Sequence, residues 1–417
     1  MQDVAVVGAG PTGLWLAAEL RLGGASVTVL ESRVERDPNS KALTIHPRTL
    51  EVLDSRGVAE PFLDEGIRIP DGHFAGLTQR LDFSVLDTPF PFTLVLVQAR
   101  TEELLEDRAR RMGATIRRGC EVTGLAEDGV VLADGEVVRA RYVAGCDGTR
   151  STVRAAAGID FPGTGPTTWG WLGDVALDAP PERGFANITG PDGGLMVVPL
   201  PGGLHRIVGG DPGANQEAWP GELTLDELRA TVTRIAGTDF GLRDPVWLSR
   251  FSNATRQAVN YRKGNVLLAG DAAHMHFPTG GVGMNVGIQD AHNLGWKLAA
   301  AATGRADETL LDTYHEERHP VGAELLEHTR AQTALMTTFS PEGQALRAVM
   351  GGLISKAPDM SRELAERLSG LGVTYATGRR VRNLRMPDGS TLFERLRTGE
   401  HVATGEGLVR PDGHLAA

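Results

Sequence analysis

The sequence predicts an α/β protein with a Rossmann-like domain, an inserted antiparallel sheet and a helical C-terminal part. Three observations predict this fold. An apolar strand-like run, Val4 to Val7, leads directly into a glycine-rich turn and a helical run. Two later apolar runs end in Asp147-Gly148 and Gly270-Asp271, and a helical pattern follows each. Between them lie short strand-like runs separated by Pro-Asp-Gly and Pro-Gly-Gly turns, which are typical of antiparallel strands.

Length and composition narrow the classes of protein. The chain has 417 residues, 41% of them hydrophobic and 23% charged, as expected for a globular protein with two or three domains. Its net charge of −11 argues against a nucleic-acid partner. No apolar run approaches the roughly 20 residues of a membrane span, and the N-terminus enters a strand without a basic leader. We therefore expect a cytoplasmic protein, a monomer or homodimer, that contacts no membrane.

The cysteines and histidines predict no metal site. Cys120 and Cys146 form neither a CxxC pair nor a zinc pattern. His274 and His276 lie two residues apart with no third ligand nearby, so we interpret them as packing residues or as residues close to the cofactor.

The first motif is typical of a dinucleotide site. The stretch Gly8-Ala9-Gly10-Pro11-Thr12-Gly13 separates the first strand from a helix, and the next strand ends at Glu31. Gly8 permits the tight turn, Gly10 lets the backbone approach a pyrophosphate, and Gly13 lets helix and strand pack closely. The helix that begins at Pro11 and Thr12 offers free N–H groups to phosphate. Glu31 can accept hydrogen bonds from ribose hydroxyls and disfavours a 2′-phosphate, but the motif alone does not separate FAD from NAD.

The second and third motifs suggest a family. Ala133-Asp134-Gly135-Glu136 predicts a hairpin turn before the strand that ends in Asp147-Gly148. Together with Gly270-Asp271, the motifs resemble those of the group A flavoprotein monooxygenases, the aromatic hydroxylases related to p-hydroxybenzoate hydroxylase. Within that group the sequence is similar to the actinomycete branch that oxidises polyketides and rifamycins. The resemblance runs from Met1 to about residue 372.

The resemblance implies FAD as the cofactor. The first motif would bind its ADP half, and Asp147-Gly148 would lie near the pyrophosphate, where the reduced nicotinamide also comes. Asp271 would lie on the ribityl side, as a buried acid bonded to a hydroxyl and to helix N–H groups. NAD(P)H, with NADPH favoured, and O2 are the expected co-substrates.

The glycine-rich bend after Asp271 is expected to hold the flavin ring. Pro278 has a fixed φ angle, and the resemblance places it beside the flavin. Gly281 and Gly283, with Gly280, leave backbone free where the ring must pack. Backbone N–H groups from Gly283 through Met284 to Asn285 begin a helix and could bond the flavin carbonyls, which would stabilise negative charge on the ring.

Three further residues match the family less specifically. Gln98 falls where relatives place a glutamine near the flavin, and Arg48 and Lys41 where a basic residue touches FAD. Lys41 stands where the family usually has arginine, so it keeps the charge and loses the planar fork. Both basic residues could instead be solvated charges at a helix end. In the family the flavin moves to meet the nicotinamide, and we expect these two residues and Gly280 to Gly283 to steady its positions.

The implied reaction belongs to the cofactor. Reduced nicotinamide delivers hydride to the flavin, and oxygen then forms a flavin hydroperoxide that hydroxylates an electron-rich aromatic carbon. No protein residue is therefore assigned as catalytic. The expected substrate is a polycyclic aromatic, polyketide-like compound of antibiotic biosynthesis. Two alternatives remain: a Baeyer-Villiger-type or rifamycin-inactivating monooxygenase, and, from another class, a non-catalytic flavin-binding protein.

The expected domains follow from the motif positions. An FAD-binding domain of the p-hydroxybenzoate hydroxylase type takes 1–70, 99–159 and 253–330, and an inserted substrate-binding β-sheet domain takes 71–98 and 160–252. Residues 331–377 are expected to be helical. Residues 378–417 resemble a thioredoxin-like domain that is either degenerate or lacks intervening residues. Large side chains of the inserted domain are candidate substrate contacts, although each is more often ordinary core: His73, Phe74, Trp169, Trp171, Met196 and Pro201.

Overall fold

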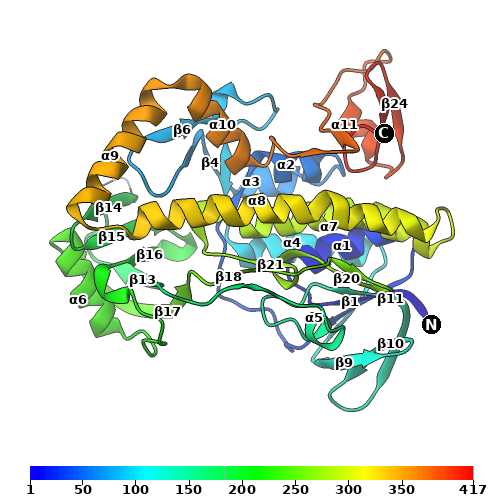
Figure 1. The fold of residues 1–417 in the computed structure, drawn as a ribbon, viewed down its shortest axis with the longest axis horizontal. Helices are drawn as coiled ribbons and strands as arrows, with labels where there is room; N and C mark the ends of the chain where they lie inside the picture. The colour runs from blue at the N-terminus through cyan, green and yellow to red at the C-terminus, as the bar shows by residue number, and fades with distance from the viewer. Residues whose placement is uncertain (183, 417) are drawn as a thin grey trace.

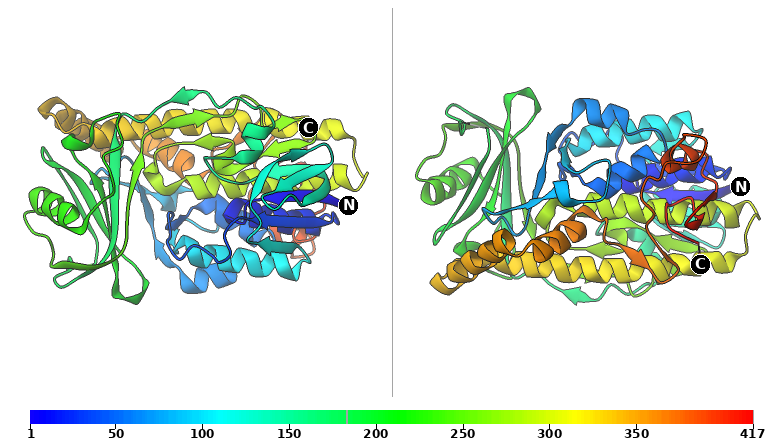
Figure 2. Two further views of the ribbon diagram at one scale, coloured as in Figure 1. Left: turned by 90° about the horizontal axis from the view of Figure 1, so that it is seen from below. Right: turned by 90° about the horizontal axis from the view of Figure 1, so that it is seen from above.

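A parallel sheet and an antiparallel sheet occupy opposite ends of the molecule. The structure, a computed structural model, describes residues 1–182 and 184–416. The long helix α8 (Asp312–Thr337) spans the molecule from the end with the parallel sheet to the end with the antiparallel sheet, as Figures 1 and 2 show. The predicted α/β fold class is confirmed.

The parallel sheet brings the three predicted motifs to one edge. Strand β1 (Gln2–Val7) lies between β11 (Val137–Gly145) and β2 (Val27–Glu31) and is parallel to both. Strand β20 (Val266–Leu268) is parallel to β11 on its other side. In the register, Val7 pairs with Gly145 and Gly145 with Leu268, so the glycine-rich turn, Asp147-Gly148 and Gly270-Asp271 follow three aligned strand ends. Ligands of parallel sheets bind at this carboxyl edge. Strands β8 (Thr115–Arg118) and β19 (Arg262–Lys263) complete the order β19-β20-β11-β1-β2-β8.

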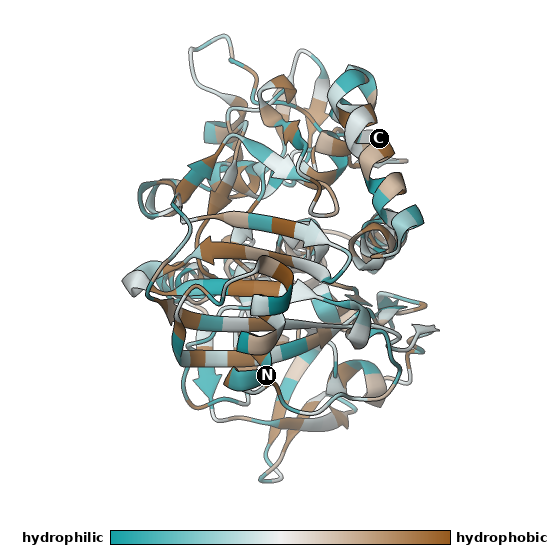
Figure 3. Ribbon diagram, turned by 90° about the vertical axis from the view of Figure 1, so that its left-hand side faces the viewer, coloured by the Kyte–Doolittle hydropathy of each residue, from teal (hydrophilic) through white to brown (hydrophobic). Residues whose placement is uncertain are grey.

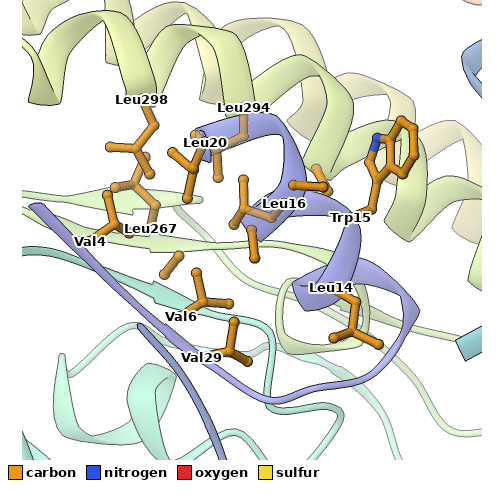
Figure 4. Packing of buried hydrophobic residues seen from close by; sticks show 14 of the residues in the cluster. Val4, Val6, Leu14, Trp15, Leu16, Leu20, Val29, Leu267, Leu294 and Leu298 are labelled. Atoms are coloured by element: carbon orange, nitrogen blue, oxygen red, sulfur yellow. The ribbon is translucent and has the colours of Figure 1, made fainter. Parts of the chain in front are cut away.

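Three helices cover this sheet and form the main core. They are α1 (Pro11–Leu22), α4 (Gln98–Arg111) and α7 (Gly283–Ala302). Val4 and Val6 of the strands pack against Leu16 of α1 and Leu294 of α7, and all four side chains are fully buried (Figure 4). Because these strands are apolar on consecutive positions, they are covered on both faces, as parallel strands normally are.

The predicted hairpin turn at Ala133 to Glu136 is confirmed. It joins β10 (Gly129–Leu132) to β11 in antiparallel register, with Val130 opposite Val138. Strand β9 (Val122–Ala126) pairs with β10, and the short helix α5 (Thr152–Ala156) follows β11.

The inserted domain contains a five-stranded antiparallel sheet. Its order is β14 (Ala186–Gly190), β15 (Gly193–Pro199), β16 (His205–Gly210), β13 (Trp169–Leu177) and β17 (Leu242–Ser252). Helix α6 (Leu225–Ala236) packs Leu228 and Val232 against this sheet. Figure 3 looks at this end of the molecule, where hydrophobic and hydrophilic segments alternate along the strands. One face of the sheet is therefore left for contacts with the rest of the chain.

The segment 71–98 lies apart from this sheet, although we expected it there. Strands β5 (Asp71–His73) and β6 (Arg80–Asp82) form a separate hairpin, and β7 (Thr93–Val95) lies between two strands of a small sheet. Leu81 and Phe83 pack into an apolar cluster with Leu368 of the helical part, which explains the placement. The neighbouring short elements are β3 (Thr44–Ile45), β4 (Ile67–Ile69), α2 (Pro47–Asp54), α3 (Glu60–Glu65), β12 (Gly163–Thr164), β18 (Thr255–Gln257) and β21 (His274–Met275).

The C-terminal part begins with helices and ends in a small unit, residues 378–416, which we call the C-terminal cap. Helices α9 (Pro341–Lys356) and α10 (Pro358–Ser369) follow α8. The cap has its own apolar cluster around Phe393 and is anchored by Arg410, whose Nη1 lies 2.6 Å from Glu317 Oε1. Among residues 378–416 the structure shows short strands and one short helix, and the predicted thioredoxin-like character of this segment stays a prediction. Its elements, with the preceding strand, are β22 (Thr374–Tyr375), β23 (Gly378–Arg379), α11 (Leu392–Leu396), β24 (Val402–Thr404) and β25 (Gly407–Val409).

Candidate flavin site and adjoining cavity

The turn after β1 has the geometry that a pyrophosphate site needs. Gly8 has φ +104°, and a Cβ there would lie 2.4 Å from the carbonyl oxygen of Cys146. A Cβ at Gly13 would lie 2.0 Å from the carbonyl oxygen of Gly8. A Cβ at Gly10, in contrast, would meet nothing within 4 Å. Gly8 and Gly13 are therefore required by packing, whereas the space beside Gly10 is open toward a ligand.

The start of α1 has free N–H groups. Gly10 is the N-cap, Pro11 the first helical residue, and no side chain caps the helix. Thr12 packs closely against Gly270 of the third motif and Gly287 of α7. A Cβ at either glycine would lie within 2.7 Å of Thr12 Oγ1. The uncapped N-terminus of a helix attracts a phosphate group.

Glu31 is fixed beside this turn. Its carboxylate accepts the backbone N–H of Ala9 at 2.9 Å and that of Arg33 at 3.0 Å. The side chain is partly exposed at the end of β2. This position suits an acceptor for ribose hydroxyls, which remains a prediction.

In the second motif the Asp147 side chain holds the start of a helix and Gly148 lies beside open space. The carboxylate of Asp147 accepts the Ser151 hydroxyl at 2.5 Å and the Val153 N–H at 3.0 Å. Gly148 has φ +78°, and a Cβ there would meet nothing within 4 Å. Asp147 thus holds the start of α5, and Gly148 leaves open space next to the strand ends.

Asp271 is exposed, which corrects the expectation of a buried acid. Its carboxylate has no hydrogen-bond partner among the described residues. The buried acid of this bend is Asp290 of α7, which accepts the Gly270 N–H at 3.1 Å and contacts His274 Nε2 and Arg318 Nε, each at 2.7 Å. Burial raises the pKa of Asp290, but Arg318 and His274 outweigh it and hold that pKa below its usual range. Asp290 was not predicted from the sequence, because it is one of several polar residues on α7 and no motif marks it.

The bend from Pro278 to Asn285 exposes its proline and fixes its glycines. Gly281 has φ +64°, and a Cβ there would lie 2.1 Å from Thr44 Oγ1. The Asn285 side chain accepts the His46 N–H at 2.8 Å and donates to the carbonyls of Thr44 and Gly281. The side chain of Asn285 is therefore used to hold the bend against β3.

The start of α7 is left for a ligand. Helix α7 begins at Gly283 without a side-chain cap, so the N–H groups of Gly283 and Met284 stay free. Both residues are partly exposed, as the predicted flavin contact requires.

Gln98, the first residue of α4, lies beside the loop that carries Lys41, but Arg48 does not. Gln98 Oε1 accepts the Ala42 N–H at 2.9 Å, and the neighbouring Lys41 is exposed. Arg48 is buried on the other side of α2, where it pairs with Glu51 at 2.9 Å and donates to the carbonyl of Asp412 at 2.7 Å. Its predicted contact with FAD, and its role in steadying the flavin, are wrong because its guanidinium holds the C-terminal cap.

A cavity lies between the five-stranded sheet and the helices α8 and α9. It is open to solvent, and its empty volume of about 600 Å³ includes part of that solvent. Its wall includes Phe277, the residue before Pro278, so the cavity adjoins the flavin bend directly. Phe277 also packs on Phe251 of β17, with ring centroids 5.1 Å apart. The lining is mostly apolar, as in sites that bind small molecules.

Two of the six predicted substrate contacts line this cavity, namely Trp169 and Met196. Trp171 is buried in the core of the five-stranded sheet and donates to Asp211. Phe74 packs in the apolar cluster under α10, and His73 lies on the separate hairpin. Pro201 is exposed in a turn. These four residues do not line this cavity, and their contacts with a substrate stay predictions. The cavity is lined by Ala75, Gly76, Thr168, Trp169, Gly170, Asn187, Thr189, Gly194, Leu195, Met196, Val208, Gly209, Gly210, Asp211, Phe251, Phe277, Met336, Thr337, Phe339 and Arg347.

Two other kinds of site are absent from the described parts of the chain. No group of three or more His, Cys, Asp or Glu side chains there could hold a metal ion. No helix there has the length and apolar character needed to cross a membrane.

The sequence and the fold both match known proteins. Residues 1–329 match the family described as FAD binding domain. The chain is 46% identical to a rifampicin monooxygenase of Streptomyces venezuelae, over 100% of this chain and 95% of that protein. The solved structure of OxyS anhydrotetracycline hydroxylase from Streptomyces rimosus has 38% identity and a TM-score of 0.90, covering 100% of this chain and 95% of that one.

A third match names a different reaction. The Diels-Alderase PyrE3 of pyrroindomycin biosynthesis has 35% identity and a TM-score of 0.90, with 100% of this chain and 96% of that chain covered. The fold alone therefore does not fix the reaction, and the cofactor site must be considered with it.

The residues present fit FAD. The open space at Gly10, the exposed Asp271 and the uncapped starts of α1 and α7 lie where the ADP half, the ribityl chain and the flavin ring would be held. With the match over residues 1–329, this chain belongs to the FAD-binding domain family and is a flavoprotein of the aromatic monooxygenase class.

Proposed function

We propose that the protein oxidises a polycyclic, polyketide-like aromatic compound, with NADPH as the favoured reductant and O2 as the oxygen source. The observation that carries this proposal is the contact between the cavity and the flavin bend at Phe277 and Pro278. A planar substrate in the cavity would lie beside the flavin ring. We further propose that the protein is cytoplasmic, as a monomer or homodimer, and belongs to antibiotic biosynthesis.

The chain's own residues would bind and orient the reactants. The N–H groups at the start of α1 would hold the diphosphate of FAD, and Asp271 would accept a hydrogen bond from a ribityl hydroxyl. The free N–H groups at the start of α7 would favour negative charge on the bound ring. When bound, FAD supplies the redox and oxygen-transfer chemistry. The apolar side chains of Phe251, Phe277 and Met336 would exclude water from the reacting carbon.

Two alternatives have specific support. Similarity to a rifampicin monooxygenase along the whole chain favours a rifamycin as an alternative substrate. Similarity to the Diels-Alderase PyrE3 favours, as the second alternative, a protein of this fold that binds FAD and does not transfer oxygen.

The test begins with the bound flavin. The purified protein is expected to release FAD, and not FMN, on denaturation. NADPH oxidation is then measured with naphthols, hydroxyanthraquinones, an anhydrotetracycline and rifampicin. The proposal expects stimulation by a polycyclic phenol and a product heavier by one oxygen atom. Stimulation by rifampicin alone would favour the first alternative, and FAD binding without stimulation by any compound would favour the second.

A further inference from the structure

Arg347 places a positive charge in the wall of the cavity. It lies on α9 and is only 7% exposed. Its Nη1 donates to the carbonyls of Leu335 at 2.8 Å and Ala75 at 3.1 Å, and its Nη2 donates to the carbonyl of Gly76 at 3.0 Å. The Nε–H and the second N–H of Nη2 have no hydrogen-bond partner among the described residues, so the guanidinium keeps donors for a ligand.

No carboxylate compensates this charge in the described structure. Arg347 forms no ion pair there, whereas the buried Arg206 and Arg318 are each paired with an aspartate. Asp211, the other charged residue of the cavity wall, accepts from the Gly213 N–H and from Trp171 Nε1. Burial without a carboxylate partner lowers the pKa of Arg347. A buried cation normally needs a compensating group, and a ligand anion would provide one here.

The loop that faces Arg347 is held in a strained conformation. Ala75 has φ +51°, which is unfavourable for a residue with a side chain, and Gly76 has φ +60°. The Ala75 N–H donates to Gln332 Oε1 at 3.0 Å, and Asn187 Nδ2 donates to the Gly76 carbonyl at 3.0 Å. These bonds fix two successive carbonyls toward the guanidinium, so its position in the wall is well defined.

A second free donor lies in the same wall. The Nε1 of Trp169 is buried without a hydrogen-bond partner. The surrounding wall is apolar, with Phe251, Phe277 and Phe339 among its residues. An apolar surround strengthens the attraction between a cation and an anionic oxygen. The cavity is thus lined by apolar side chains together with a cation and a residue that has a free N–H donor.

We propose that Arg347 is a specificity-determining residue that selects substrates bearing an anionic oxygen, a phenolate or enolate, on a polycyclic aromatic framework. This inference rests on the proposed function, because it takes the cavity as the substrate site. A purely structural role for Arg347, in which it only ties α9 to α8 and to the loop at Ala75, predicts no preference for ionised ligands.

The test compares two ligands of nearly equal shape on the FAD-loaded protein without NADPH. They are 2-hydroxyanthraquinone, which ionises, and 2-methoxyanthraquinone, which does not. Dissociation constants come from ligand-induced changes in the flavin absorption spectrum, below and above the pKa of the hydroxy ligand. Above that pKa the wild type is expected to prefer the ionised ligand by about 10- to 100-fold, the usual effect of a charge-assisted hydrogen bond. Below the pKa of the hydroxy ligand, where both ligands are neutral, the preference for it over the methoxy ligand should disappear.

Two variants separate charge recognition from structure. Arg347→Gln should abolish the preference and leave the affinity for the methoxy ligand within about threefold of wild type. Lys356→Gln, which removes a positive charge from the exposed end of the same helix, should keep the preference. Arg347→Lys keeps the charge and should retain part of it. If Arg347→Gln does not fold, the wild-type comparison across pH still decides.

Several outcomes would overturn the inference. One is equal weakening of both ligands in Arg347→Gln, and another is a wild type without preference above the ligand's pKa. If neither ligand perturbs the flavin up to its solubility limit, the inference fails together with the assignment of the cavity. Selective binding without any oxygenated product would support the inference and contradict only the proposed turnover.

Discussion

The buried carboxylate of Asp290 accepts the backbone N–H of Gly270 at 3.1 Å, in the bend whose next residue, Asp271, is exposed. Two acids therefore have different tasks at one bend. Asp290 is bonded to His274 and Arg318 and holds the backbone in place. Asp271 has no partner in the described structure and is available to a ligand. This division predicts that the two carboxylates affect stability and cofactor affinity separately.

Replacing the exposed acid should weaken the binding of FAD. Asp271→Asn is expected to lower FAD affinity about 10- to 100-fold through loss of a charge-assisted hydrogen bond, with the apoprotein as stable as wild type. Asp107→Asn, which changes an exposed acid on α4, is the matched control. Titration of the apoprotein with FAD, followed by flavin fluorescence, measures both. Equal affinities in the two variants would refute the role of Asp271.

Replacing the buried acid should instead destabilise the fold. Asp290→Asn leaves Arg318 and His274 without their anion, and removing one partner of a buried ion pair typically costs about 3–5 kcal/mol. Urea unfolding of the apoprotein is the measurement. A loss of less than about 1 kcal/mol would contradict the account of this bend.

The glycines of the first turn should also differ in effect, because one is expected to influence FAD affinity and the other the stability of the apoprotein. Gly10→Ala is expected to leave apoprotein stability nearly unchanged, because a Cβ there meets nothing within 4 Å, and to reduce FAD affinity by crowding the diphosphate. Gly13→Ala, whose Cβ would lie 2.0 Å from a backbone oxygen, should destabilise the apoprotein itself. Melting temperatures with and without FAD distinguish the two. If Gly10→Ala binds FAD as tightly as wild type, the open space does not receive the diphosphate.

The ion pair between Glu19 and Arg56 predicts a pH-dependent stability. Burial raises the pKa of Glu19, but Arg56 and His292 outweigh it and lower that pKa from 4.5 to about 2. A depressed pKa stabilises the fold above the unfolded value of 4.5, and the contribution is lost as the pH falls toward 2. Wild type should therefore exceed Glu19→Gln in stability by on the order of 3 kcal/mol near neutral pH. The difference should narrow below pH 4.5 in urea titrations, and a constant difference would contradict the assignment.

Local patterns in the sequence predicted the turn after the first strand. Gly8 and Gly13 follow an apolar strand directly, and the structure shows the close packing expected at both, whereas the phosphate contact at Gly10 stays a prediction. The alignment of the three motifs also followed from the rule that parallel strands end at one edge. Asp290 and Arg347 could not be predicted in this way, because their partners come from distant segments.

The differences between prediction and structure have the same physical origin. The sequence placed Arg48 at the start of a helix, where we expected it to contact FAD or solvent. In the structure the C-terminal cap buries it against Glu51 and Asp412. Phe74 and Trp171 are large apolar residues in the expected domain, yet one fills the cluster under α10 and the other fills the sheet core. Which apolar side chains face a cavity depends on how separate elements pack, and the spacing of residues in one segment does not contain that information.

The central claim is that this protein transfers oxygen from O2 to an aromatic substrate at the site between Asp271 and the cavity. The most direct measurement is a reaction of the FAD-loaded protein with NADPH and isotopically labelled O2, using a polycyclic phenol that binds. Mass spectrometry of the product is predicted to show one labelled oxygen atom per molecule, with about one NADPH consumed for each. An FAD-loaded protein that binds the phenol and yields an unlabelled or unchanged compound would contradict the claim.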